Sequence, residues 1–169
     1  MEAISEVFFD YISVRTFWRV LQFAHYTMAV ALLGLVTLQS VAVLMPVQQA
    51  AGNFISRVRA APAAAYVKPI VILYVPTFLL GAWIYIKYRT YVRIPMEQFG
   101  HWWTVGTFEF KEHIVAMGVA LLPAYWYFWR TPAPEHARTR LILTTLLAFI
   151  VWWGFIVGHL TNNIRGLAT

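Results

Sequence analysis

The chain has 169 residues, of which 60% are hydrophobic, 17% are aromatic and only 12% are charged. A soluble domain of this length usually carries about 25% charged residues, so the composition argues against a water-soluble fold and indicates one membrane domain. The net charge is +6, but the basic residues flank apolar runs, which points to lipid headgroups as their partners and not to nucleic acid. Cysteine is absent from the sequence, which excludes disulfides, thiolate metal sites and cysteine nucleophiles.

Four apolar runs follow one another along the chain. The first covers about 18–45 and is too long for the apolar core of a secretory signal, so we expect a retained span. The second covers about 69–87 and contains Pro76 and Gly81, which membrane helices tolerate. The third and fourth cover about 109–130 and 140–161. The sequence therefore predicts an all-α protein, with residues 1–169 forming a single transmembrane domain that is an integral membrane four-helix bundle.

Four spans place both termini and the connection 87–110 at one end of the bundle, which we call the N-side. That connection is rich in aromatic residues, which favour the membrane interface, so we expect a loop that lies over this end. The basic residues divide almost evenly between the two ends. Of the seven acidic residues, only Glu135 belongs to the opposite end, and this asymmetry predicts an N-terminus outside the cell.

Four of the five histidines fall on the N-side. His25 lies inside the first span, His113 opens the third and His159 closes the fourth, whereas His101 is in the aromatic connection and His136 is at the other end. Ionisable residues inside a membrane are costly and are candidates for functional sites by default. Imidazole can ligate haem iron or bind a divalent metal. We expect His25 and His113 to ligate a haem iron, with His159 able to replace either.

A haem between helices also needs cations for its propionates, and Arg19 and Lys111 lie near the N-side interface. The predicted cofactor-binding set is therefore His25, His113, His159, Lys111 and Arg19. A second possibility is a carboxylate–histidine metal site, because Glu109 and His113 are four residues apart and share a helix face. The sequence lacks the second carboxylate–histidine pair that di-iron bundles carry.

Two short segments carry a resemblance to a known group of proteins. QFAHYTMAV holds a histidine early in the first span, and FEFKEHIVAMGVAL holds a lysine that opens the third. This layout resembles the superfamily of small four-helix haem-handling membrane proteins that includes bacterial membrane protoporphyrinogen oxidase and the copper-resistance D membrane domain. The resemblance implies a multi-pass protein of the bacterial inner membrane in which His25 and Lys111 are the important pair around haem. The oxidase family's Trp and Ala-Gly followed by Leu-Pro-Arg is absent after His25.

The four-span plan is also similar to b-type cytochrome membrane subunits. The leading hypothesis is a membrane-embedded protein that binds haem b and takes part in electron transfer, as the haem-carrying subunit of a membrane oxidoreductase with quinone as a substrate. The short second and third spans predict contacts with other membrane subunits as well as with the lipid bilayer. Two alternatives remain open: a cofactor-free accessory subunit, and a porphyrin- or metal-handling membrane enzyme.

Overall fold

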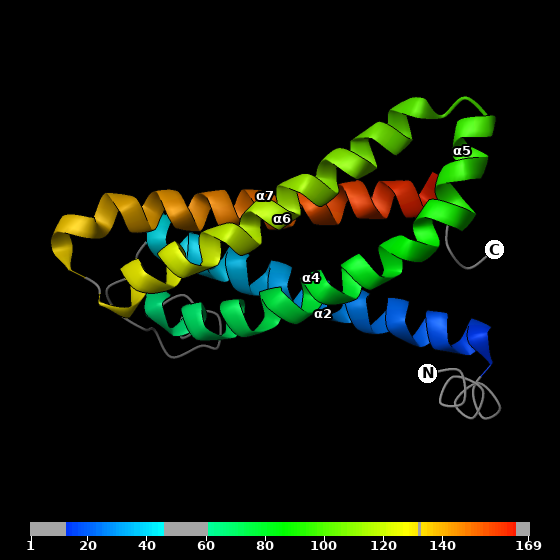
Figure 1. The fold of residues 1–169 in the computed structure, drawn as a ribbon. Helices are drawn as coiled ribbons and strands as arrows, with labels where there is room; N and C mark the ends of the chain where they lie inside the picture. Colours follow the sequence, from blue (N-terminus) through cyan, green and yellow to red (C-terminus); the bar gives the residue numbers. More distant parts are fainter. Residues whose placement is uncertain (1–12, 46–60, 132, 165–169) are drawn as a thin grey trace.

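The computed structural model describes residues 13–45, 61–131 and 133–164, and in these ranges the protein is all-helical, without a strand. Four long helices succeed one another: α2 Val14–Leu44, α4 Val67–Tyr88, α6 Trp102–Arg130 and α7 Ala137–Ile164 (Figure 1). The short helices are η1 Ala63–Tyr66, η2 Arg89–Arg93, α5 Ile94–Gln98 and η3 Pro134–His136. Consecutive long helices run antiparallel, and each packs on two others, because α2 contacts α4 and α7 while α6 contacts α4 and α7. The predicted all-α class is confirmed.

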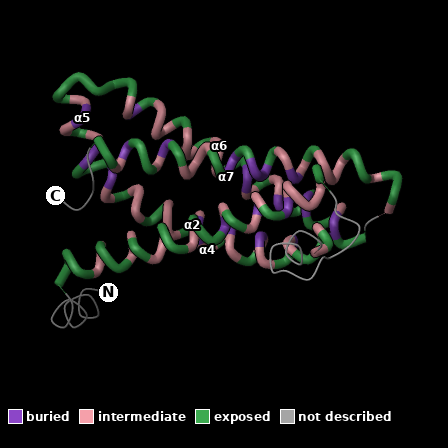
Figure 2. The backbone as a smooth tube through the Cα atoms, turned by 180° about the vertical axis from the view of Figure 1, so that it is seen from behind, coloured by how far each residue is buried: buried purple, intermediate pink, exposed green. Residues whose placement is uncertain are grey.

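Three helical stretches are long and apolar enough to cross a membrane by length and composition: Val14–Leu44, Ala63–Gln98 and Pro134–Ile164. Helix α6 is also long enough, but its tyrosine and tryptophan residues and the charged pair Lys111 and Glu112 make it less apolar. Exposed positions recur along every long helix (Figure 2). Many of them carry large apolar side chains, such as Phe23, Leu79 and Phe149. Such outer faces suit contact with lipid, as expected for a membrane protein.

The expected loop at 87–110 is helical over most of its length. Helix α4 continues through the π-helical turn η2 and through α5, and α6 begins at Trp102, so that a helical hairpin projects at the N-side (Figure 1). Tyr88, Val92 and Met96 recur every fourth residue and pack with Val105 of α6 into a small core of their own. Gly100 supplies the turn, with a φ of 77° that favours glycine. The sequence predicts a loop here because the many aromatic residues of 87–110 are typical of a membrane interface. They make the four-residue spacing of Tyr88, Val92 and Met96 hard to recognise.

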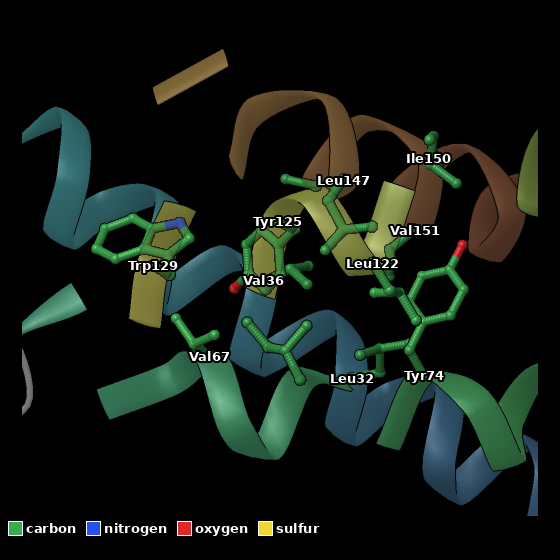
Figure 3. Close-up of a cluster of buried hydrophobic side chains, with 12 residues drawn as sticks. Leu32, Val36, Val67, Tyr74, Leu122, Tyr125, Trp129, Leu147, Ile150 and Val151 are labelled. Atoms are coloured by element: carbon green, nitrogen blue, oxygen red, sulfur yellow. The ribbon is translucent and has the colours of Figure 1, made fainter. Parts of the chain in front are cut away.

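The main core lies between the four helices, towards the end opposite the N-side (Figure 3). Its buried polar groups are hydrogen-bonded: Tyr125 donates to the Gln39 side-chain oxygen at 2.6 Å, and the Gln39 amide nitrogen donates to the Ala63 carbonyl at 3.2 Å. The Trp129 indole donates to the Thr144 hydroxyl at 3.2 Å. Buried polar groups without partners are costly in a membrane, and these hydrogen bonds remove that cost. The cavities described below lie nearer the N-side.

Candidate cofactor-binding cavity

A cavity of about 450 Å³ lies between the four long helices, on the N-side of the main core. Its volume falls in the range of roughly 300–1,000 Å³ that is usual for small-molecule and cofactor sites. The walls are mostly apolar and come from α2, α4, α6 and α7. The polar side chains that line it are His25, Tyr26, Tyr74, Thr77, Lys111, Glu112, His159 and Asn162. An apolar hollow with a few convergent polar groups is the usual form of a ligand site.

The imidazole of His25 is oriented by a backbone group of the neighbouring helix. Its Nδ1 lies 3.1 Å from the carbonyl oxygen of Thr77 in α4. Because a carbonyl can only accept a hydrogen bond, Nδ1 carries the proton, and Nε2 of the neutral ring is left with a free lone pair. Histidines that ligate metals are commonly held in this way by a carbonyl on the other ring nitrogen. His25 therefore has the tautomer that an axial ligand needs.

Glycines give the His25 ring and the cavity their room. A Cβ at Gly81 would lie 3.0 Å from Cε1 of His25, so the absence of a side chain there lets the ring lie against α4. On α7, Gly154 and Gly158 are one turn apart and both line the cavity. A Cβ at Gly158 would meet no heavy atom within 4 Å, which shows that this position faces open space. Apolar walls, small residues and an imidazole nitrogen with a free lone pair are features that a cofactor site requires.

Lys111 and Glu112 bring charge to the cavity wall. Both are partly buried, and Lys111 Nζ lies 2.5 Å from a carboxylate oxygen of Glu112. Lys111 Nζ also lies 3.9 Å from the ring centroid of Phe108, which adds a cation–π contact. Charged groups inside a membrane bundle are expensive unless paired, and they mark functional positions. This pair supplies a cation to the cavity without leaving a bare charge.

His159 of α7 also lines this cavity. Its side chain is exposed, so it lies at the outer edge of the cavity. Its ring lies parallel to that of Phe155, with 6.2 Å between the centroids. The structure thus brings His25 and His159 to one cavity, from helices α2 and α7. These are two of the three histidines predicted to ligate iron.

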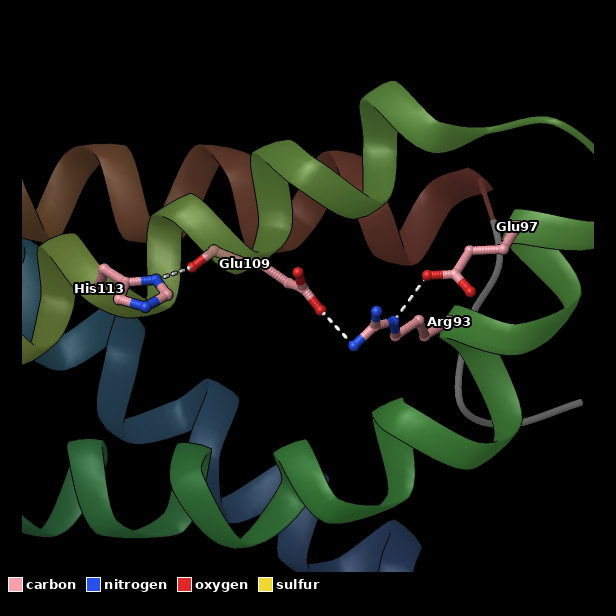
Figure 4. A network of polar contacts seen from close by, with 4 residues as sticks. All are labelled: Arg93, Glu97, Glu109 and His113. Carbon is pink, nitrogen blue, oxygen red and sulfur yellow. Dashed lines mark hydrogen bonds and ion pairs between the residues drawn. The ribbon is translucent and has the colours of Figure 1, made fainter.

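His113 lies elsewhere, on the exposed side of α6. Its Nδ1 is 2.7 Å from the carbonyl oxygen of Glu109 one turn earlier (Figure 4). The His113 ring does not line the cavity. The Glu109 carboxylate points away from His113 and lies 2.8 Å from Arg93, which also bonds Glu97 at 2.7 Å. The structure therefore does not bring His25 and His113 to the same cavity.

Arg19, the last member of the predicted cofactor-binding set, lies outside the cavity, as do His101 and His136, which were not in that set. Arg19 is exposed on α2, and His101 is exposed at the start of α6. His136 packs edge-on against Phe128 at the opposite end. Within the described ranges, no group of three or more histidine, aspartate or glutamate side chains is placed to hold a metal ion. A metal centre of the di-iron kind is thus unsupported in this part of the chain.

The sequence reasoning missed the Thr77 carbonyl, Gly81, Glu112 and Asn162. A backbone carbonyl has no sequence signal, but Gly81 could have been found, because it lies in the middle of an apolar run opposite the predicted His25 site. Comparison with protein-family models, curated proteins and solved structures finds no match to this chain. The function of this chain must therefore be inferred from the cavity.

Proposed function

We propose that this chain binds one haem b in the large cavity and takes part in electron transfer within the membrane. The observation that supports the proposal most directly is the imidazole of His25, which lines the cavity and is held by the Thr77 carbonyl so that Nε2 is free. Haem supplies one-electron chemistry when it is bound. The protein would supply an axial ligand, an apolar wall and a defined orientation.

The other cavity residues take distinct parts in this proposal. His159 is the candidate second ligand, since it borders the same cavity. Lys111 would balance the negative charge of a propionate, and Glu112 keeps the lysine oriented. The apolar walls lower the local dielectric constant and so strengthen these charge interactions. The redox partner that we propose is a membrane quinone. We also propose that the chain is one subunit of a larger membrane complex.

A porphyrin-handling enzyme is the second candidate function. It is favoured by one observation: His25 and Lys111, the two residues that carry the resemblance to the haem-handling superfamily, line the same cavity, while His113 does not. In that case the porphyrin would be a substrate that leaves the cavity. Haem that copurifies and resists exchange favours the electron-transfer function, whereas a porphyrin that is bound and released favours the enzyme.

The haem content of the purified protein tests the proposal. We expect about one haem b per chain, since the cavity of about 450 Å³ would hold one macrocycle, and a reduced spectrum typical of b-type haem. The measurement is an optical spectrum with a quantitative haem assay, made before and after reconstitution with haem. A chain that stays colourless after reconstitution would contradict haem binding and support a cofactor-free accessory subunit.

We also propose that α6 crosses the membrane as the fourth span, in a bacterial inner membrane with the N-side outside. Support comes from its length, its packing along α7 and the inward position of its charged pair. Trp103→Cys lies in the first turn of α6 and Glu135→Cys lies beyond its last residue, both at exposed positions, and the natural chain has no cysteine to interfere. An impermeant thiol reagent should label Trp103→Cys from outside and Glu135→Cys only from inside. Labelling of both from one side would show that α6 does not cross.

A further inference from the structure

A second, smaller cavity of about 70 Å³ adjoins the large one on its N-side. The two hollows share five lining residues: His25, Tyr26, Lys111, Gly158 and Asn162. The residues that line only the small cavity lie closer to the helix ends, with Gln22 early in α2, Tyr88 at the end of α4 and Thr161 near the end of α7. The small cavity therefore lies between the large cavity and the N-side end of the bundle.

Tyr88 brings a buried hydroxyl to the wall of this space. Its side chain is only 2% exposed, and its hydroxyl has no hydrogen-bond partner in the described part of the chain. The ring itself is fixed by stacking on Phe108, with 4.0 Å between the centroids, so the hydroxyl cannot easily turn elsewhere. A buried hydroxyl without a partner is unfavourable, and buried water is the usual solution.

The lining also includes the apolar side chains Ile84, Val92 and Phe108, and its polar groups outside α4 lie on α2, α6 and α7. Gln22 donates to the Tyr26 hydroxyl at 2.7 Å and lies 3.5 Å from the Asn162 side-chain oxygen, so amide and hydroxyl groups of α2 and α7 meet here. A buried water needs two to four polar partners, which these groups and Lys111 provide. The volume holds about two waters at a liquid-like share of about 30 Å³ each, which is too small for an organic cofactor.

We propose that the small cavity is a water-filled passage that connects the aqueous phase at the N-side with the large cavity, and that protons reach Lys111 and Glu112 through it. The passage is a property of the helices and holds whether the large cavity takes a haem, another porphyrin or no cofactor. Reactions that move electrons or porphyrin hydrogens in the large cavity would then exchange protons with one side of the membrane only.

Silver ions can test this passage, because Ag⁺ is close to water in size, binds thiolates and does not enter hydrocarbon. Gly158→Cys places a thiol where both cavities meet, and a Cβ there meets nothing within 4 Å. Gly34→Cys is the matched control: it is the same substitution, also free of contacts, at an exposed mid-helix position of α2 that borders neither cavity. The natural chain, without cysteine, gives the baseline.

The full-length variants are reconstituted in lipid vesicles and exposed to Ag⁺ from the N-side, and the remaining free thiol is then counted by alkylation and mass spectrometry. Thiolates form only where water and protons exchange, so Gly158→Cys should react at least about tenfold faster than Gly34→Cys. Adding Asn162→Leu removes a polar group shared by both cavities and should slow Gly158→Cys by about tenfold.

Equal rates for Gly158→Cys and Gly34→Cys would overturn the proposal. A fast Gly158→Cys that Asn162→Leu does not slow would also overturn it, because water would then arrive by another route. If Gly158→Cys fails to fold, Thr161→Cys, a near-isosteric change at a 4% exposed position of the small cavity, replaces it with the same expected result. None of these readouts needs haem, so a failure of haem binding leaves this test decisive by itself.

Discussion

His25→Ala is expected to abolish haem binding, so that the purified variant loses the reduced b-type spectrum even after reconstitution with haem. The His25 imidazole lines the cavity and has a fixed tautomer, because the Thr77 carbonyl accepts the Nδ1 proton at 3.1 Å. Alanine removes the nitrogen that would bind iron and leaves the rest of the cavity in place. The haem-to-protein ratio after reconstitution is the measurement.

His113→Ala is the matched control, since it is the same substitution at an exposed site of α6 outside the cavity. We expect its haem content to equal that of the natural protein, whereas His159→Ala should shift the spectrum or lower the content as a second ligand would. A loss of haem in His113→Ala as complete as in His25→Ala would show that the ligand assignment is wrong.

The orientation of the ring can be tested separately from its presence. Gly81→Ala would place a Cβ 3.0 Å from Cε1 of His25, so the ring must shift away from α4 and weaken its bond to the Thr77 carbonyl. Changes to groups that orient a metal ligand typically cost 10–100-fold in affinity, and we expect a loss of about tenfold in haem affinity here. Unchanged affinity would mean that the Thr77 contact does not position the ligand.

Gly118→Ala is expected to give the largest loss of stability, about 3 kcal/mol in the free energy of unfolding. A Cβ at Gly118 of α6 would overlap the hydroxyl oxygen of Tyr74 and lie 2.7 Å from its Cζ. Tyr74 is 1% exposed and donates to the Val115 carbonyl at 3.0 Å, so its ring cannot move away from Gly118 without losing this hydrogen bond. The added methyl group would separate α4 from α6 or break this hydrogen bond.

Unfolding in mixed detergent micelles measures the loss, and two further variants show its cause. Gly34→Ala has open space around its Cβ and should be neutral or stabilising by up to about 1 kcal/mol, because alanine favours a helix over glycine. Tyr74→Phe removes the overlapping oxygen, so Gly118→Ala should cost less in that background, and the double-mutant cycle reports the coupling. A cost as small as that of Gly34→Ala would contradict the close packing of α4 on α6.

The helices could be predicted from the sequence because a long apolar run in a membrane can adopt few backbone structures. Backbone groups must be satisfied internally, so each run becomes a helix, and the predicted spans fall on α2, α4, α6 and α7. The segment 87–110 was misjudged because its exposed aromatic residues resemble an interfacial loop, while the buried period of Tyr88, Val92 and Met96 became evident only through packing against Val105.

By itself the sequence determined the helical class, the apolar outer faces and the presence of an ionisable histidine early in the first apolar run. Only the tertiary structure decided which groups share a cavity. Lys111 and His113 are two residues apart, so their side chains leave α6 about 200° apart, and only one can face inward. The rotation of α6 about its axis places Lys111, and not His113, at the cavity. Contacts such as Gly118 with Tyr74 and Val115 with Gly154 set this rotation. Those contacts join positions far apart in the chain, and therefore no local pattern contains them.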